Sequence, residues 1–489
     1  MRPPWPLALL LCVGCGESLT PLPGPVALVP VNPNPKTKVD LLFMVDNSNS
    51  MDAMQQVLRD RFFEFFKPFD ELAKNGQYVD FHIGVVTSDY GAGATGAPGC
   101  TPSPGGQMGK LQAIGLKAYG NCSKPMGANF IEFSNAPNGP NNLPMGQDLA
   151  QTFTCMASVG AEGCGFEHQL ESVYAALHDA PPENAGFLRD DAALAVAFLT
   201  NEDDASSRPD TDVFSKNRTD RYGYEDSYSR QTRFAIVCCP PGVATCKPEE
   251  MVEPPYADSS GPLTNCRANP DPASPQYGAQ RYIDFFTRPA AQGGAKKDPM
   301  DVLLYAIDAP DEPFRVILGN PGVLLQQEQC PDLNESGQPP CVPVLQHSCQ
   351  NPVQPVLFGD PAVRLNTVVR SVAQHRIWSI CDDDYAGALH KLANLVVSQL
   401  GAACLSDDHF SGARPADIQC TAADVVLDID QQTETPIARC DGATYPCWQV
   451  ESKPACTDLS STGAGLTILR NSVPAPANTI VRAACKPLR

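Results

Sequence analysis

Short apolar runs that stop at a polar residue alternate with amphipathic segments along most of the chain. A run of this kind is typical of a strand buried on both faces, as in a parallel sheet. Apolar residues at helical spacing between the runs indicate helices that pack on the sheet. The alternation predicts an α/β fold with a mainly parallel sheet and helices on both faces. The predicted strands are residues 40–45, 81–89, 194–200, 302–307 and 376–380, and helices are expected at about 54–72, 167–177, 281–288, 364–373 and 389–400.

The first predicted strand ends in a loop rich in side-chain oxygens. Asp46 follows the strand directly, and Ser48 and Ser50 come at the next alternate positions before a helix begins. In an open α/β sheet, ligands bind at the carboxyl ends of the strands. One carboxylate and two hydroxyls there suit a hard divalent cation. The alternative is a simple strand-to-helix turn in which the two serines cap the helix.

A second polar cluster follows the strand predicted at 194–200. It contains Asn201, Glu202 and Asp203. Parallel strands present their carboxyl ends at one edge of the sheet, so this cluster is expected near the Asp46 loop. Taken alone, the cluster would be a solvated acidic loop. Its place after the Asp46 loop favours a shared metal site.

The Asp46-x-Ser48-x-Ser50 run, with a strand before it and a helix after it, resembles the metal-ion-dependent adhesion site (MIDAS) of von Willebrand factor A-type (vWA) domains. Its form, with Asn47 and Met51, is similar to the version common in bacterial members. The resemblance covers roughly residues 39–404. It implies a Rossmann-like, doubly wound sheet with long disulfide-bearing insertions, expected here at about 90–127, 205–278 and 309–360.

The same resemblance implies a bound Mg²⁺ or Ca²⁺, with Mn²⁺ as a further candidate. Ser48 and Ser50 would ligate the ion directly, Asp46 and a residue near Asn201 would act largely through water, and an acidic side chain of a protein partner would complete the shell. Two positions depart from the pattern. Asn201 stands where an Asp is usual, and Cys164 stands where a Thr ligand is usual. Glu167 is either a substitute ligand or a first-turn acid that the helix dipole favours.

Composition points to an exported protein. The chain has 489 residues, a formal charge of -20 and no visible basic patch, which argues against nucleic acid as a partner. Its 20 cysteines indicate an oxidising compartment. Residues 1–15 resemble a lipoprotein signal peptide of Gram-negative bacteria, with Cys15 as the lipidated residue and Gly16 favouring the outer membrane. The alternative is an ordinary cleaved signal with Cys15 in a disulfide.

The flanking regions are expected to be small. Residues 16–38, rich in Pro and Asn, predict an extended tether. Residues 405–489 lose the helical period and predict a disulfide-stapled β module. Nine disulfides are expected in the mature chain. Cys381 is expected to pair with Cys404 across the last helix, Cys155 with Cys164, and Cys100 with Cys122.

The motifs favour a binder over an enzyme. The sequence contains no H-E-x-x-H, G-x-S-x-G, P-loop or dinucleotide fingerprint, and its seven His form no zinc pattern. We therefore expect a membrane-anchored envelope protein that binds a protein partner through a MIDAS-like site. The alternatives are a structural envelope lipoprotein with a degenerate site and, less favoured, an unrecognised hydrolase.

Overall fold

The computed structural model divides into two compact units, one of residues 36–400 and one of residues 1–35 with 401–489. Residues 1–26, with Cys15, lie outside the described part, as do Cys330, Cys341 and much of the insertions predicted at 205–278 and 309–360. The described residues are 27–31, 36–74, 78–93, 100, 106–117, 120–211, 213, 234–254, 261–319, 342–398, 402–405, 410–427, 432–453, 456, 460–471, 475 and 479–487.

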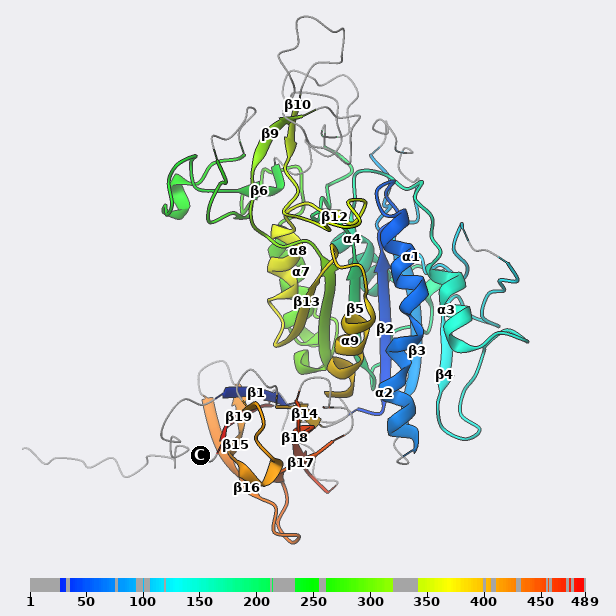
Figure 1. The fold of residues 1–489 in the computed structure, drawn as a ribbon, viewed down its shortest axis with the longest axis vertical. Coiled ribbons are helices and arrows are strands. Elements are labelled where there is room, and N and C mark those ends of the chain that lie inside the picture. Colours follow the sequence, from blue (N-terminus) through cyan, green and yellow to red (C-terminus); the bar gives the residue numbers. More distant parts are fainter. Residues whose placement is uncertain are drawn as a thin grey trace, which may run out of the picture. The chain divides into compact units, whose positions relative to one another are not determined.

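A six-stranded sheet forms the centre of the larger unit (Figure 1). Its order is β13-β8-β5-β2-β3-β4, and every neighbouring pair is parallel except β3 and the edge strand β4. β2, β3, β5 and β8 are buried along almost their whole length, as the apolar runs predicted. The strands are β2 (Lys38–Val45), β3 (Asp80–Thr87), β4 (Ile131–Ser134), β5 (Ala193–Leu199), β8 (Val302–Asp308) and β13 (Gln374–Ser379).

Helices cover both faces of this sheet (Figure 1). On one face, Phe43 of β2 packs against Phe62, Phe65 and Phe153. On the other face, a continuous core joins Leu42 and other strand residues to three helices, α4, α7 and α8. The helices are α1 (Asp52–Arg61), α2 (Phe63–Lys74), α3 (Leu149–Ala157), α4 (Gln169–Tyr174), α7 (Ala279–Thr287), α8 (Val363–Val369) and α9 (Ala386–Ser398).

The direction of winding reverses at β2. The chain moves from β2 to β3 and β4 on one side, and later to β5, β8 and β13 on the other. The crevice outside the carboxyl ends of β2 and β5 is therefore the topological switch point, where open α/β sheets bind ligands. Asp46 follows β2 and Asn201 follows β5 by two residues, so the fold brings both predicted clusters to this point.

The smaller unit is a seven-stranded sheet, which confirms the predicted β-rich module and, with the sheet of the larger unit, the predicted vWA-type fold class. The tether predicted at 16–38 is wrong for residues 27–31, because they form β1 and pair antiparallel with β19. Three disulfides join residues within this unit: Cys404–Cys456, Cys420–Cys485 and Cys440–Cys447. In sheet order the strands are β1 (Ala27–Val31), β19 (Thr479–Pro487), β15 (Ile418–Leu427), β16 (Gln432–Arg439), β17 (Cys447–Ser452), β18 (Ala464–Leu469) and β14 (Ala402–Cys404).

The predicted disulfide between Cys381 and Cys404 is wrong. Cys381 pairs with Cys349, while Cys404 pairs with Cys456. The 13 residues of α9 lie between the two predicted partners. Cys381 and Cys404 belong to different units, and each pairs with a cysteine of its own unit.

The disulfides predicted near the insertion at 90–127 are also wrong. Cys155 pairs with Cys122, and Cys164 pairs with Cys100. Both bonds therefore attach the insertion to the main body, one to α3 and one to the loop before α4, instead of closing each segment on itself. The eight disulfides between described residues indicate a chain that folds in an oxidising compartment outside the cytoplasm.

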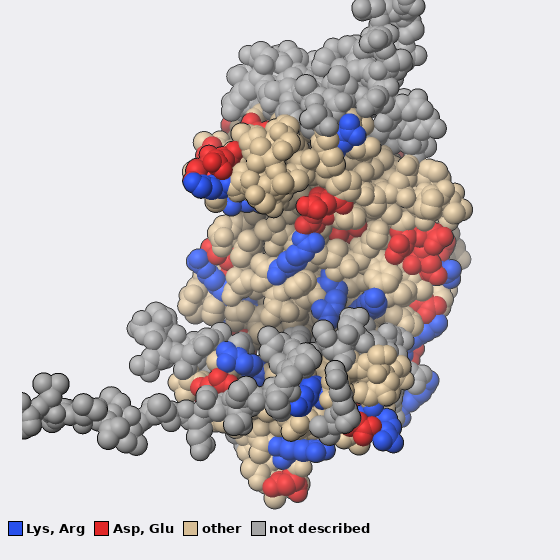
Figure 2. Space-filling model, turned by 60° about the vertical axis from the view of Figure 1, so that its left-hand side comes forward, with Lys and Arg blue, Asp and Glu red and all other residues tan. Residues whose placement is uncertain are grey.

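Charge is mixed on the surface. On the face drawn in Figure 2, the Lys and Arg side chains of the described residues are scattered among Asp, Glu and many uncharged residues. Within the described part of the chain, no helix is both long and apolar enough to cross a bilayer.

Candidate functional site

Asp46 is the buried centre of the site. Its side chain is fully enclosed, and both carboxylate oxygens accept hydrogen bonds. Oδ1 accepts the Ser48 amide and the Ser88 hydroxyl, each at 2.8 Å, and Oδ2 accepts the Thr200 hydroxyl at 2.7 Å. Burial raises the pKa of Asp46, although these hydrogen bonds lower it. Both oxygens of Asp46 are thus occupied by protein donors.

Two hydroxyl groups and one amide lie next to Asp46. The Ser48 and Ser50 hydroxyl oxygens are 3.3 Å apart, and Ser50 donates to the Asn201 amide oxygen at 3.0 Å. Neither serine caps α1, because the N-cap residue is Met51 and it makes no side-chain cap bond. The capping alternative therefore fails, and the two hydroxyls face the polar cluster after β5 instead.

Glu167 enters the same site from the loop before α4. Its side chain is buried beside the Glu202 carboxyl group and the Ser48 hydroxyl. Burial raises the pKa of Glu167 well above its ordinary value, and the negative charges of Glu202 and Asp46 raise it further. Its Oε2 atom is buried without a hydrogen-bond partner. A carboxyl group in this position either holds a proton or requires a cation beside it.

The loop that carries Glu167 is held tightly against the Asp46 loop. The Gly163 amide donates to the Asn47 carbonyl at 2.7 Å, and a Cβ on Gly163 would lie 2.4 Å from Asn47 Oδ1. Only glycine allows this approach without displacing Asn47. Cys164 stands at the position of the expected Thr ligand and has no hydroxyl. Its sulfur forms a disulfide with Cys100.

Asp203 does not join the site. Its carboxylate accepts the backbone amides of Arg364 and Leu365 at 2.8–3.0 Å, at the start of α8. Burial raises the pKa of Asp203 to about 7. The structure thus brings six of the seven predicted metal residues together: Asp46, Ser48, Ser50, Glu167, Asn201 and Glu202.

Three supporting residues escaped the sequence analysis. Ser88 and Thr200 donate to the Asp46 carboxylate, and the Gln55 amide donates to the Asp46 carbonyl and to Gly160, both at 2.8 Å. Ser88 and Thr200 follow the ends of β3 and β5, so the rule that indicated Asn201 could have indicated them. Nothing in the sequence pattern distinguished Gln55 from other polar residues of its helix.

The side-chain oxygen atoms of these residues are of the chemical type that binds a hard divalent cation. Among the residues that the structure describes, no three His, Cys, Asp or Glu side chains are grouped to hold a metal by themselves. Here, however, two hydroxyls and an amide oxygen adjoin the carboxyl groups, and all of these are oxygen donors of the kind that Mg²⁺ and Ca²⁺ take. Among the described residues, Glu167 Oε2 is a buried carboxyl oxygen without a hydrogen-bond partner, and it belongs to the residue next to these hydroxyls. The residues therefore fit the ion that the resemblance implied.

Comparisons with known proteins find only weak structural similarity. No protein-family model matches it, and no curated protein matches it. It is similar to a von Willebrand factor type A structure from Catenulispora acidiphila (TM-score 0.27, 8% identity), of which it covers 58% with 93% of its own length.

Two pilus adhesins are similar at the same level. RrgA from Streptococcus pneumoniae has TM-score 0.29 and 9% identity over 95% of this chain and 58% of that one. SpaC from Lactobacillus rhamnosus GG has TM-score 0.29 and 8% identity over 93% and 40%. The chain thus spans little more than half of the first two structures. The assignment of a vWA-type fold rests on the strand order and on the loops that this order brings together.

Proposed function

We propose that residues 36–400 form a binding module that holds a hard divalent cation at the Asp46 loop and engages a protein partner through that cation. The observation that carries this proposal is the buried, partnerless Glu167 carboxyl oxygen beside two hydroxyls and two further carboxyl groups. A buried acidic cluster of this kind is costly unless protons or a cation neutralise it.

In this proposal each residue has a distinct role. Ser48, Ser50 and Glu167 supply direct oxygen ligands, while Asp46 and Asn201 orient the hydroxyls and hold bridging water. The bound ion, Mg²⁺, Ca²⁺ or Mn²⁺, supplies net positive charge, which allows an acidic protein to bind an acidic side chain of its partner. Ser50 and Glu202 are partly exposed, so the partner's carboxylate would approach from their side.

The test is calorimetric titration of the exported chain with Mg²⁺, Ca²⁺ and Mn²⁺ in turn. We expect binding of one ion per chain, and we expect Ser48→Ala to weaken it at least tenfold. Ser371→Ala is a matched control. Ser371 follows α8, outside the site, and its hydroxyl donates to the Val368 carbonyl. If the wild-type chain gives no heat of binding, or if Ser48→Ala and Ser371→Ala bind the ion with equal affinity, a structural protein with a degenerate site would be favoured.

We further propose that the exported chain is attached to the outer membrane through a lipid on Cys15. The support is the signal-like sequence before Cys15 together with the disulfide content that marks an extracytoplasmic protein. Cys15→Ser should move the protein from the membrane pellet to the soluble fraction. A mature N-terminus other than Cys15, determined by mass spectrometry, would refute the lipid anchor.

A further inference from the structure

A buried carboxyl group at the end of β8 takes no part in the site at the Asp46 loop. Asp308 is the last residue of β8 and is only 1% exposed. Neither of its carboxyl oxygens has a hydrogen-bond partner among the residues that the structure describes. A buried carboxylate without partners is costly, so such a group either takes up a proton or pairs with a cation. One of these two must neutralise Asp308.

Asn366 of α8 places a third oxygen atom of this kind beside Asp308. Its side chain is fully buried, and its Nδ2 donates to the Ala309 carbonyl at 3.1 Å and to Asp311 Oδ1 at 2.6 Å. These two bonds fix which end of the amide is the nitrogen. The other end, Oδ1, is buried and has no hydrogen-bond partner within the described part of the chain. Because the Asn366 side chain lies beside the Asp308 carboxyl group, three buried acceptor oxygens lie between β8 and α8.

The charges around Asp308 are mainly negative. Burial raises the pKa of Asp308 well above its ordinary value, and the negative charges of Asp311 and Asp203 raise it further. Arg370 acts in the opposite direction, but its guanidinium group forms an ion pair with Asp311. Three carboxyl groups thus share the charge of one guanidinium group. A further cation at this place would be attracted by the excess negative charge.

A proton on Asp308 would leave most of these oxygens without partners. A carboxylic acid has one O–H group, which can donate to only one acceptor. A hard cation can take several oxygens at once, and Ca²⁺ accepts carboxylate and Asn side-chain oxygens in irregular geometry, whereas Mg²⁺ demands a near-ideal octahedron. Among the described residues, no three acidic, His or Cys side chains converge on one point. The Asn366 oxygen is therefore a necessary member of the ligand set.

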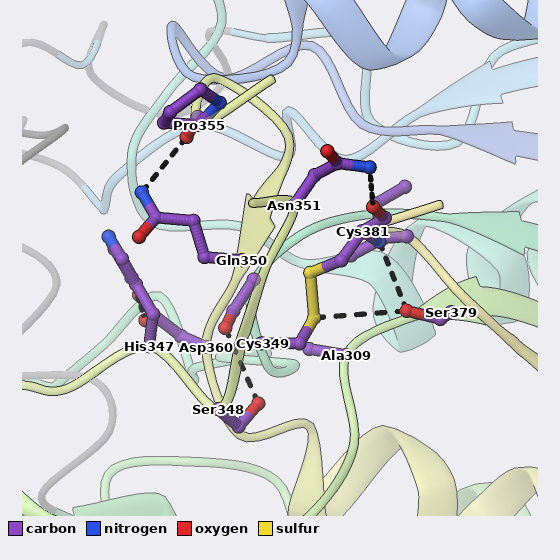
Figure 3. The surroundings of a disulfide bond; sticks show 12 residues. Ala309, His347, Ser348, Cys349, Gln350, Asn351, Pro355, Asp360, Ser379 and Cys381 are labelled. Carbon is purple, nitrogen blue, oxygen red and sulfur yellow. Dashed lines mark hydrogen bonds and ion pairs between the residues drawn. A yellow bond between two sulfur atoms is a disulfide. The ribbon is translucent and has the colours of Figure 1, made fainter. Parts of the chain in front are cut away.

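The packing around the end of β8 would enclose such an ion. The Ile380 amide donates to the Asp308 carbonyl at 2.8 Å. The next residue, Cys381, forms a disulfide with Cys349, and Figure 3 shows Ala309, which follows Asp308, beside this disulfide. Segments that are buried and cross-linked in this way open rarely. An ion bound to Asp308 should therefore leave the folded chain slowly.

We infer that Asp308 and Asn366 hold a structural Ca²⁺ that joins the end of β8 to α8. Thr200 separates this ion from the one proposed at the Asp46 loop, because its amide donates to the Ile307 carbonyl at 3.2 Å while its hydroxyl donates to Asp46. The inference does not rest on the proposed function. The enclosed ion would enter as the chain folds, so it would be in place before any titration of the Asp46 loop and would not change the stoichiometry of one ion per chain.

The experiment is elemental analysis of the exported chain, folded in the presence of CaCl₂ and then passed over a desalting column into metal-free buffer. We expect about one Ca²⁺ per chain in the wild type and in Ser48→Ala, and less than about a tenth of that in Asp308→Asn. Asp301→Asn is the matched control and should keep the ion. Asp301 is also a buried acid, but its carboxylate pairs with Lys36 at 2.9 Å.

Measurements on the wild type decide the question even if Asp308→Asn does not fold. Prolonged incubation of the desalted wild-type chain with EDTA should remove the ion and lower the melting temperature by about 3 °C or more. A wild-type chain without calcium, equal calcium in the wild type and Asp308→Asn, or a melting temperature that EDTA leaves unchanged would overturn the inference and show that Asp308 holds a proton. Calcium retained in Ser48→Ala supports the site at Asp308 whatever the titration of the Asp46 loop shows.

Discussion

Replacing Glu167 by Gln tests whether this side chain serves a cation or only the fold. Gln has nearly the same shape but removes the charge, and the buried carboxyl group at this position is already under strong pressure to be neutral. Without added metal, Glu167→Gln should therefore be as stable as wild type or slightly more stable, because repulsion from Glu202 and Asp46 is relieved. With metal, the variant should lose a charged ligand.

The size of the effect follows from the affinity expected of such a site. An extracellular cation site of this kind binds at about 10⁻⁴–10⁻³ M, so 10 mM metal stabilises the folded chain by about 1.4–2.7 kcal/mol. For a unit of about 365 residues, this corresponds to a rise in melting temperature of roughly 2–3.5 °C. A tenfold weaker site, as expected for Glu167→Gln, would give only about 0.5–2 °C.

The assay is differential scanning calorimetry with and without 10 mM MgCl₂ at fixed ionic strength. Glu171→Gln is the matched control, because Glu171 is a buried acid of the same segment but is held by Arg281 and Tyr282 away from the hydroxyl pair. We expect the metal-induced shift to be retained in Glu171→Gln and at least halved in Glu167→Gln. An undiminished shift in Glu167→Gln would refute the ligand role of this residue, and a large loss of stability without metal would show that it is a structural acid.

Three further predictions concern the fold. Burial raises the pKa of Glu171 to about 7, so the folded chain keeps this proton between about pH 4.5 and 7, and the stability that the proton provides is lost as the pH rises through 7. In denaturant titrations at pH 5 and 8, Glu171→Gln should remove about 3 kcal/mol of that pH dependence. An unchanged dependence of the unfolding free energy on pH would contradict the assignment. Gly359→Ala should destabilise the chain by about 1–3 kcal/mol, because the added Cβ meets Ala309 and Ile380. Gly261→Ala is the control and should be near neutral, because there is open space around Gly261. Equal effects of the two substitutions would argue against close packing around Gly359. Peptide mapping without reductant should recover Cys100–Cys164 and Cys349–Cys381, and a fragment linking Cys381 to Cys404 would show that the pairing described here is incorrect.

The sheet could be predicted because its signal is local. Each central strand is a short apolar run, and burial on both faces leaves few other ways to place such a run. The disulfides could not be predicted, because pairing depends on which loops meet in space. Cys381 and Cys404 flank α9 along the chain, but each pairs within its own unit, with Cys349 and Cys456 respectively. The strand β1 was missed because it has only five residues and contains Pro30, and pairing with β19 is what makes it a strand.

The site could be predicted as a place but only partly as a set of residues. The ends of β2 and β5 identified Asp46 and Asn201, since chain order alone places both at the switch point. The direction of each acidic side chain after β5 could not be derived, because it depends on contacts made far along the chain. Asp203 faces α8, whose first residue is about 160 positions away, whereas Glu202 faces Glu167.

The two departures from the family pattern are connected in the structure. Cys164 gives up the expected hydroxyl ligand and fixes the insertion through Cys100, and the same loop then carries Glu167 into the site three residues later. Asn201 lacks the charge of the usual Asp, and Glu167 places a carboxyl group next to the same hydroxyls. We propose that the Glu167 carboxyl group compensates for the Asp that Asn201 replaces. Asn201→Asp should therefore tighten cation binding in Glu167→Gln more than in wild type, because the wild-type site would then hold one carboxylate too many. Calorimetric titration of the two single variants and the double variant gives the coupling directly, and strictly additive changes in binding free energy would show that the two positions act independently.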